Sequence, residues 1–335
     1  MLLPLPGAAL ALIGLALVFD FLNGFHDSSN IVATMISSRA IGPRRALLIT
    51  AAAEASGPFL FGVAVARTIG SEIVAEAAAT MPVLIAGLVA AIGWNLFTWF
   101  FGIPSSSSHA LIGGIAGAAI TGFGLEALKW AGLGKVFFAL LISPPLGLLV
   151  GHLLMKVILF LARKATPRIN LFFKRGQVVT ALSLALSHGT NDAQKTMGII
   201  TLGLMAAGAL PVFAVPLWVV AISAGAIALG TSLGGWRLIR TLGGRFYTIR
   251  PVHGFATQTA SATVILGAAL LGGPVSTTQV VSSAILGAGS AERLSKVRWG
   301  VAGQIGIAWL LTIPMSAALA AIVYGLLHAL HIFES

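Results

Sequence analysis

The sequence predicts an all-α polytopic membrane protein made of two inverted-topology repeats, and three observations support this fold class. The chain is 57% hydrophobic and only 9% charged, whereas soluble domains contain roughly 25% charged residues. Several apolar stretches approach the roughly 20 residues that a helix needs to cross a bilayer. Two polar motifs each occur twice, in the same order. A soluble core does not explain such long apolar stretches, so we assign the chain to a lipid bilayer.

Apolar spans between charged loops predict about ten membrane crossings, roughly five in each half. Polar motifs interrupt the first and the sixth span, so we expect discontinuous helices there. Very short turns join two of the span pairs, which predicts helical hairpins. The predicted spans are 8–38 (broken), 45–66, 81–101, 104–124, 136–161, 177–203 (broken), 217–235, 251–272, 275–290 and 299–327.

Basic residues are distributed unevenly over the predicted loops. If Arg39, Arg44 and Arg45 are cytoplasmic, fifteen loop arginines and lysines fall on that side and three on the other. This is a positive-inside pattern, which one missed span would destroy. It predicts a multi-pass protein of a plasma membrane, the cytoplasmic membrane of a prokaryote, with both termini extracytoplasmic. The net charge of +11 then reflects orientation, and no nucleic-acid partner is expected.

The two polar motifs of the first half recur in the second half. Residues 23–30 (NGFHDSSN) align with 188–195 (HGTNDAQK) at an offset of 165, and residues 102–109 (GIPSSSSH) align with 272–279 (GGPVSTTQ) at an offset of 170. Each half holds an odd number of predicted crossings, so the second copy enters the membrane from the opposite side. The predicted units are a first repeat at 1–161, a basic cytoplasmic linker at 162–176 and a second, inverted repeat at 177–335.

The first motif places an aspartate inside each of two apolar spans. Without compensation, Asp27 and Asp192 would each cost roughly 2.5–3.5 kcal/mol at the centre of a membrane helix. Gly24 and the neighbouring polar side chains suggest that the helix unwinds there and exposes backbone groups to an ion. The alternative is a surface loop between two short helices, which the charge of Lys195 in the second copy makes harder to accept.

The second motif places hydroxyl side chains directly after a proline or one residue later. Proline suits the start of a helix, where free N–H groups and the positive end of the dipole favour an anion. Ordinary helix capping explains one serine-rich turn, but two symmetric copies favour an oxyanion cradle. The candidate residues are Ser105, Ser106, Ser107, Ser108, Ser276, Thr277 and Thr278.

Other polar residues also lie inside apolar spans. Glu54 is expected either to face the interior, beside a cation or a proton, or to lie exposed near a helix end. Asn95 and Gln258 stand at roughly matching places in the two halves. Either amide could serve only to join neighbouring helices.

At these residues the chain resembles the inorganic phosphate transporter (PiT) family of cation-coupled symporters. The resemblance lies in the duplicated Gly-x-x-Asp signature at 24–30 and 189–195, in the proline-led hydroxyl turns at 104–109 and 274–279, and in Glu54. It covers essentially the whole chain. It implies a transporter, not an enzyme, that imports inorganic phosphate by alternating access with sodium ions or protons and without a cofactor.

The resemblance also implies roles for the motif residues. The hydroxyl residues of both turns would surround phosphate. Two departures leave the number and kind of coupling cations open: His26 stands opposite Asn191, and Gln258 stands where many relatives have glutamate. This class of fold favours a homodimer. The set implied for cation binding or coupling is Asp27, Asn30, Glu54, Asn191, Asp192 and Gln279, of which Asp27, Asn30, Asn191 and Asp192 are the implied sodium ligands.

Several alternatives stay open on the sequence alone. The carried species could be sulfate, in a permease of the same fold, or a divalent metal phosphate complex. A passive anion channel fits the hydroxyl turns but leaves the acidic residues unexplained. An intramembrane aspartyl protease would use two aspartates, but neither Asp27 nor Asp192 follows the Gly-x-Gly sequence of such enzymes.

Overall fold

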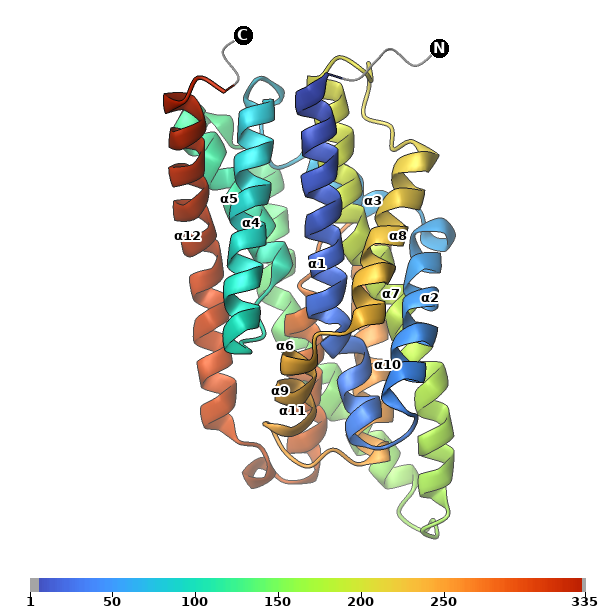
Figure 1. Ribbon diagram of the computed structural model, residues 1–335. Helices are drawn as coiled ribbons and strands as arrows, with labels where there is room; N and C mark the ends of the chain where they lie inside the picture. The colour runs from blue at the N-terminus through green and yellow to red at the C-terminus, as the bar shows by residue number, and fades with distance from the viewer. Residues whose placement is uncertain (1–5, 333–335) are drawn as a thin grey trace.

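The computed structural model describes residues 6–332, which form a bundle of long helices (Figure 1). Within these residues the only extended pairing is an isolated bridge between Val74 and Leu128, so the predicted all-α class is confirmed. The elements are α1 (Gly7–Ser37), α2 (Pro43–Phe61), α3 (Ala64–Ser71), η1 (Glu76–Ala78), α4 (Met81–Phe101), α5 (Ser107–Phe123), η2 (Leu125–Ala127), α6 (Trp130–Leu161), α7 (Ile169–Ala206), α8 (Leu217–Leu233), α9 (Trp236–Gly244), α10 (Pro251–Leu270), α11 (Thr277–Glu292), η3 (Leu294–Lys296) and α12 (Trp299–Ala329).

Four of the described helices, α1, α4, α6 and α12, are long and apolar enough to cross a membrane. The pairs α2–α3 and α8–α9 pass the same test together, although they bend by 79° and 69°. These elements account for six of the ten predicted crossings. The other four, 104–124, 177–203, 251–272 and 275–290, correspond to α5, α7, α10 and α11 and stay predictions.

The first and the sixth predicted spans are not broken. Helices α1 and α7 run continuously through Asp27 and Asp192, and the breaks lie instead between α2 and α3 and between α8 and α9. The expected unwinding at Gly24 is therefore wrong. This glycine has another role: a Cβ there would collide with the backbone carbonyl of Ile227. Glycine thus lets α1 and α8 approach closely, as small residues do in membrane helices.

Helices α4 and α5, and likewise α10 and α11, form hairpins. Figure 1 shows the two hairpins entering from opposite ends of the bundle, with their turns near its middle. The turns begin at Gly102 (φ 67°) and Gly272 (φ 72°), a conformation that glycine adopts without strain. The predicted hairpins are therefore present, and their turns meet the motif segments of α1 and α7.

The connections of the bundle separate into two groups (Figure 1). Helix α1 begins and α12 ends at one end of the molecule, whereas the α1–α2, α6–α7, α9–α10 and α11–α12 connections lie at the other. The connection between α6 and α7 is non-helical only over 162–168, because 169–176 form the first turns of α7. Nine of the twenty lysines and arginines lie in the four connections at this second end, and Arg44, Arg45, Lys174 and Arg175 lie in the first turns of the helices that follow two of them.

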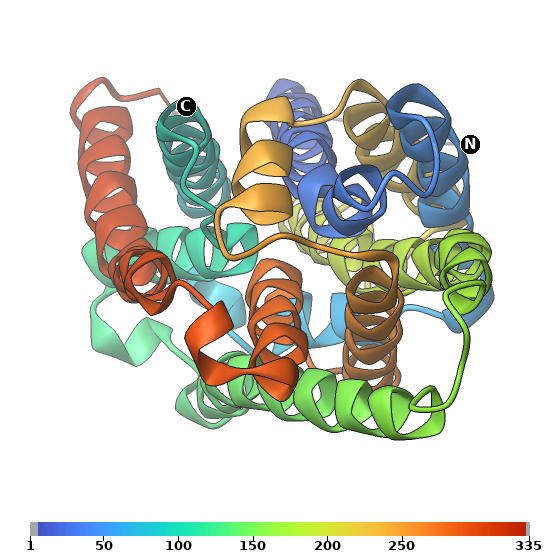
Figure 2. The ribbon, with the colours of Figure 1, turned by 90° about the horizontal axis from the view of Figure 1, so that it is seen from below.

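Helices α6 and α12 lie at the rim of the bundle, as the view along its axis shows (Figure 2). Only 28% and 17% of their most apolar segments are buried inside the protein. Leu141 of α6 and Leu310 of α12 are both 77% exposed. Exposed apolar surface of this extent marks a face that contacts a membrane or another protein.

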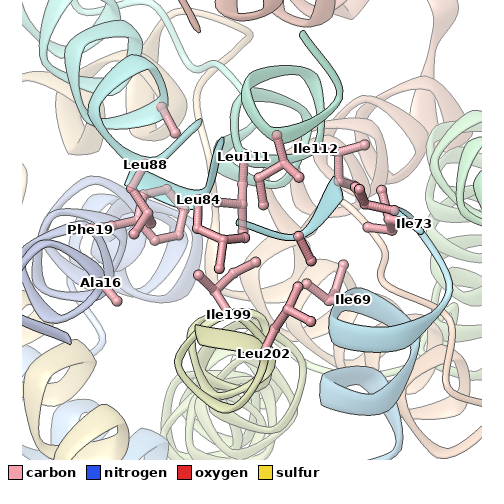
Figure 3. Close-up of a cluster of buried hydrophobic side chains, with 14 of the residues drawn as sticks. Ala16, Phe19, Ile69, Ile73, Leu84, Leu88, Leu111, Ile112, Ile199 and Leu202 are labelled. Atoms are coloured by element: carbon pink, nitrogen blue, oxygen red, sulfur yellow. The ribbon is translucent and has the colours of Figure 1, made fainter. Parts of the chain in front are cut away.

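Two large apolar cores lie on either side of the polar motifs, and a third, smaller cluster lies around Met155 and Phe173. Figure 3 shows part of the first core, where Phe19 of α1, Leu84 of α4 and Ile199 of α7 pack together. The second core contains Ile31 of α1 and Leu184 of α7. Because α1 and α7 contribute to both cores, the polar segments between those residues are enclosed from both ends.

Candidate functional site

Polar side chains of α1, α5, α7 and α11 form a buried layer between the two cores. Asp27, Asp192, Lys195 and His188 are all fully buried. Burying a charged group costs roughly several kcal/mol unless an opposite charge or hydrogen bonds compensate for the lost water. The contacts of these four side chains therefore decide what the layer can bind.

Three carboxylates surround His188. Its Nδ1 lies 2.6 Å from Glu54 Oε1, and its Nε2 lies 3.0 Å from Asp192 Oδ2 and 3.6 Å from Asp27 Oδ2. One ligand atom from each of Asp27, His188 and Asp192 lies within 4.8 Å of the other two. The three groups are thus close enough to share one cation, whose charge would offset theirs.

The first turns of α11 and α5 add hydroxyl groups to this cluster. Thr277 Oγ1 donates to Asp192 Oδ2 (2.8 Å) and lies 3.3 Å from Asp27 Oδ2. Thr278 Oγ1 donates to Asp27 Oδ1 (3.0 Å), and Ser107 Oγ donates to an amide oxygen of α1 (2.6 Å). Two helix N-termini therefore reach the layer from opposite ends of the bundle, and their dipoles favour negative charge between them.

Asn30 and Lys195 occupy the same place in the two motif copies but make different contacts. Asn30 Nδ2 donates to a threonine hydroxyl of α11 (3.1 Å), and its Oδ1 has no hydrogen-bond partner among the described residues. Lys195 Nζ donates to Ser108 Oγ (2.6 Å), to the Val275 carbonyl (3.3 Å) and to an Asp192 oxygen. A lysine ammonium has three N–H donors, and each has an acceptor here.

Five of the predicted site residues are buried nearby but bond elsewhere: Ser105, Ser106, Ser276, Asn191 and Gln279. Ser106 and Ser276 cap α5 and α11, each accepting a hydrogen bond from a backbone N–H three residues later (3.2 and 3.3 Å). Asn191 donates to a carbonyl of the α10–α11 turn (3.2 Å). The Gln279 amide nitrogen lies 3.1 Å from a histidine nitrogen of α5, and the Ser105 hydroxyl pairs with a threonine hydroxyl of α4 (2.7 Å). The predicted residues that do converge are Asp27, Asn30, Glu54, Ser107, Ser108, Asp192, Thr277 and Thr278.

Sequence reasoning gave His188 and Lys195 no role and missed Asp20 entirely. Asp20 lies two turns before Asp27 on α1, fully buried beside Thr196 of α7. Within residues 6–332 no hydrogen bond of good geometry reaches its carboxylate. The rule that a charged residue inside an apolar span is functional by default would have found all three.

Two cavities reach the hairpin turns from opposite ends. One of about 530 Å³ extends to the α10–α11 turn, where Thr68 Oγ1 of α3 donates to the Gly272 carbonyl (2.9 Å). The other, of about 270 Å³, is lined by Arg237 and two further arginines and extends to the α4–α5 turn. There Thr241 Oγ1 of α9 donates to the Gly102 carbonyl (3.1 Å). The central cluster is buried between two turns that are held by equivalent hydrogen bonds.

A helical membrane bundle with ionisable groups enclosed at its centre is typical of a transport protein. Residues 23–320 match the phosphate transporter family, and the chain belongs to that family. It is 43% identical over 317 residues to the probable low-affinity inorganic phosphate transporter of Bacillus subtilis (strain 168), covering 93% of this chain and 95% of that protein. A protein of the same name from Mycobacterium bovis is 46% identical over 320 residues, covering 93% of this chain and 76% of its own length.

The fold is also shared with a solved structure described as the sodium-dependent phosphate transporter. The TM-score is 0.87 at 26% sequence identity, and the match covers 97% of this chain and 100% of the other. The family expected from the motifs is therefore confirmed. Because these relatives are transporters, the protein is a membrane transporter of the phosphate family and not an enzyme, and the protease alternative is wrong.

Proposed function

We propose that the protein imports inorganic phosphate by symport with sodium ions or protons, through alternating access around the buried cluster. The observation that carries this proposal is the contact of Thr277 with both Asp27 and Asp192. A hydroxyl at the start of α11 reaches a carboxylate from each of the two long helices. Groups suited to an anion and groups suited to a cation thus share one site, so binding of either ion changes the affinity for the other.

Each group in the cluster has a separate role in this proposal. Ser107, Ser108, Thr277 and Thr278 donate hydrogen bonds to phosphate oxygens once they exchange their present acceptors for the substrate. Hydroxyl donors bind an oxyanion without the strong retention that several arginines would cause, which suits a carrier that must release its substrate. Oxygen atoms of Asp27 and Asn30 bind the coupling cation, because carboxylate and amide oxygens suit hard cations.

Phosphate import requires a coupling cation on energetic grounds. A dianion that moves inward against roughly 150 mV costs about 7 kcal/mol, at 2.3 kcal/mol per charge per 100 mV, and a monoanion costs about half of that. Each cation that enters together with the anion offsets one unit of its charge. A carrier with carboxylates beside its anion site can use the cation gradient to drive accumulation.

Alternating access rests on two inverted repeats, 1–161 and 177–335, joined by the basic segment 162–176. The packing supports this division, because α5 packs on α12 as α11 packs on α6, and α1 packs on α8 as α7 packs on α2. Equivalent glycines lie at the latter two crossings. Gly24 of α1 faces the Ile227 carbonyl of α8, and Gly189 of α7 faces the Glu54 carbonyl of α2.

The two hairpin turns are the gates in this proposal. Breaking the hydrogen bond between Thr68 and Gly272 would open the site toward the end where α1 begins. Breaking the one between Thr241 and Gly102 would open it toward the basic end. The positive-inside rule makes the basic end cytoplasmic, so the termini are extracytoplasmic in the membrane of the cell. The arginines beside the α4–α5 turn would then give the cytoplasmic gate a positive potential, which favours movement of phosphate out of the buried site.

The test is uptake of radiolabelled phosphate into proteoliposomes that contain the purified protein, under imposed sodium or proton gradients. We expect accumulation above equilibrium that follows one of the two gradients and that a tenfold excess of sulfate leaves in place. Downhill flux alone would support a channel, and competition by sulfate would support a sulfate permease. Dependence on a divalent metal would instead support a metal phosphate complex as the carried species.

A further inference from the structure

Lys195 and Asn30 form the same hydrogen bond in the two halves of the chain. Asn30 is related to Lys195 by the offset of 165, and their partners Thr278 and Ser108 are related by the offset of 170. Asn30 Nδ2 donates to Thr278 Oγ1 at 3.1 Å, and Lys195 Nζ donates to Ser108 Oγ at 2.6 Å. The two side chains therefore stand at equivalent points of one pseudo-symmetric site.

The two points differ in the charge that the protein itself supplies. Beside Asp27, the Oδ1 atom of Asn30 is a fully buried acceptor with no hydrogen-bond partner among residues 6–332. Beside Asp192, the Lys195 ammonium is surrounded by three oxygen atoms, from a hydroxyl, a backbone carbonyl and a carboxylate. These are the ligand types that a small hard cation takes in proteins. The Asn30 position thus offers ligands to a cation, whereas the Lys195 position already carries a positive charge.

We propose that Lys195 is a tethered cation, which takes the place of a mobile coupling ion at one of two equivalent positions in the transport site. This inference rests on the proposed function. A coupling cation binds on the Asp27 and Asn30 side, whereas the Asp192 side keeps its positive charge throughout the cycle. Because Ser108 bonds to the ammonium, Lys195 also serves as a fixed countercharge beside the phosphate hydroxyls.

The tethered charge changes the stoichiometry of transport. A mobile cation contributes its charge to the current and its gradient to the driving force in every cycle, but a lysine that stays with the protein contributes neither. The protein therefore moves one cation fewer per phosphate than the same site with asparagine in both halves. With fewer cations per cycle, the ion gradient drives weaker accumulation of phosphate. The lower ion count also suits a phosphate monoanion better than a dianion, because less charge has to be offset.

The decisive variant is Lys195→Asn, which gives both halves the same residue. Equilibrium binding of radioactive sodium to the purified protein counts the sites, and the membrane potential at zero net phosphate flux counts the charges moved per phosphate at fixed pH. We expect the variant to bind one more sodium ion per chain than the natural protein, to move one more positive charge per phosphate, and to show a steeper sodium dependence. A folded variant with an unchanged sodium count and an unchanged charge per phosphate would overturn the proposal.

The reverse substitution, Asn30→Lys, keeps the proposal testable if Lys195→Asn does not fold. It supplies a tethered cation on the Asp27 side, so we expect one positive charge fewer per phosphate and the loss of a bound sodium ion where the natural protein binds one. An Asn30→Lys protein that keeps its charge count would contradict the inference. Asn30→Gln is the matched control, because it changes the side-chain length but adds no charge.

These measurements also separate this inference from the proposed function. Sodium binding to the purified protein does not depend on phosphate movement. If the natural protein failed to accumulate phosphate while Lys195→Asn still gained a sodium ion, only the symport proposal would fail. If phosphate accumulated but both variants kept the natural ion count, only the tethered-cation inference would fail.

Discussion

The two copies of the aspartate motif have the same place in the fold and different electrostatic surroundings. Asp27 accepts a hydrogen bond from Thr278 and lies 2.8 Å from a nitrogen of its neighbour His26. Asp192 pairs with the ammonium of Lys195 and accepts a hydrogen bond from Thr277. Both aspartates thus accept a hydrogen bond from a threonine of α11, but only Asp192 has a buried ammonium beside it. The comparison teaches that two copies of one motif can place different charges around the same acidic residue.

The largest expected effect comes from removing the carboxylate charge in each half. We expect Asp27→Asn and Asp192→Asn each to lower phosphate uptake by roughly 100-fold or more, because each removes a charge that compensates buried cations. Only Asp192→Asn leaves a buried lysine without its ion-pair partner. Breaking such a pair costs about 3–5 kcal/mol, so this variant should also have the lower thermal unfolding temperature in detergent.

A double variant sharpens the same comparison. Asp192→Asn combined with Lys195→Met removes both members of the pair, and we expect it to recover most of the lost thermal stability while uptake stays low. Equal unfolding temperatures for the two single aspartate variants would show that the halves do not differ in charge as described.

The next largest effect is expected for Glu54→Gln. Within residues 6–332, the hydrogen bond that joins Glu54 to the cluster is the one to His188, at 2.6 Å. Its removal therefore tests a contact that reaches both aspartates indirectly. Hydrogen bonds to charged groups contribute about 1.5–3 kcal/mol, and tenfold corresponds to about 1.4 kcal/mol. We expect uptake to fall by roughly tenfold to 100-fold. Glu72→Gln is the control, because this glutamate is partly exposed in the cavity beside Lys135, and it should retain nearly full uptake.

Thr277→Val and Ser107→Ala compare the two helix starts. Thr277 contacts both aspartates, whereas Ser107 donates to Asn23. Loss of a neutral hydrogen bond costs about 0.5–1.5 kcal/mol, and an unsatisfied buried partner costs about 1–3 kcal/mol. We expect both variants to raise the KM for phosphate, but only Thr277→Val to change the cation dependence. A cation dependence that changed equally in both would mean that the hydroxyl bridge to the carboxylates is unimportant.

The smallest effects are expected at the two gates. Thr68→Val and Thr241→Val each remove one hydrogen bond to a turn carbonyl, worth about 0.5–1.5 kcal/mol, and should alter uptake only a few-fold. We expect Thr68→Val to expose the α10–α11 turn more often and Thr241→Val to expose the α4–α5 turn more often. The chain has no cysteine, so a single Val275→Cys or Ser105→Cys reports opening of either turn to a thiol reagent. Equal labelling of both reporters in both variants would contradict separate gates.

Much of this protein could be predicted from its residues one stretch at a time. Apolar length identified six of the ten predicted crossings, and the positions of Pro104 and Pro274 identified the two hairpin turns. The interruption expected at Gly24 was wrong because a polar motif resembles an unwound helix when its partners are unknown. Here α1 stays helical, since threonines of α11 pair with Asp27 and Asn30 and the helix satisfies its own backbone groups.

The sequence by itself determined the membrane environment, the duplication and the residue types of the site, because hydropathy and spacing are properties of the chain. The tertiary structure decided which of those residues meet. It joined His188 to Glu54 across 134 positions, placed Lys195 against Ser108 across 87 positions, and left Asn191 and Gln279 with other partners. Such contacts depend on how helices cross and rotate against one another. Packing sets that rotation, and no local pattern in the sequence records it.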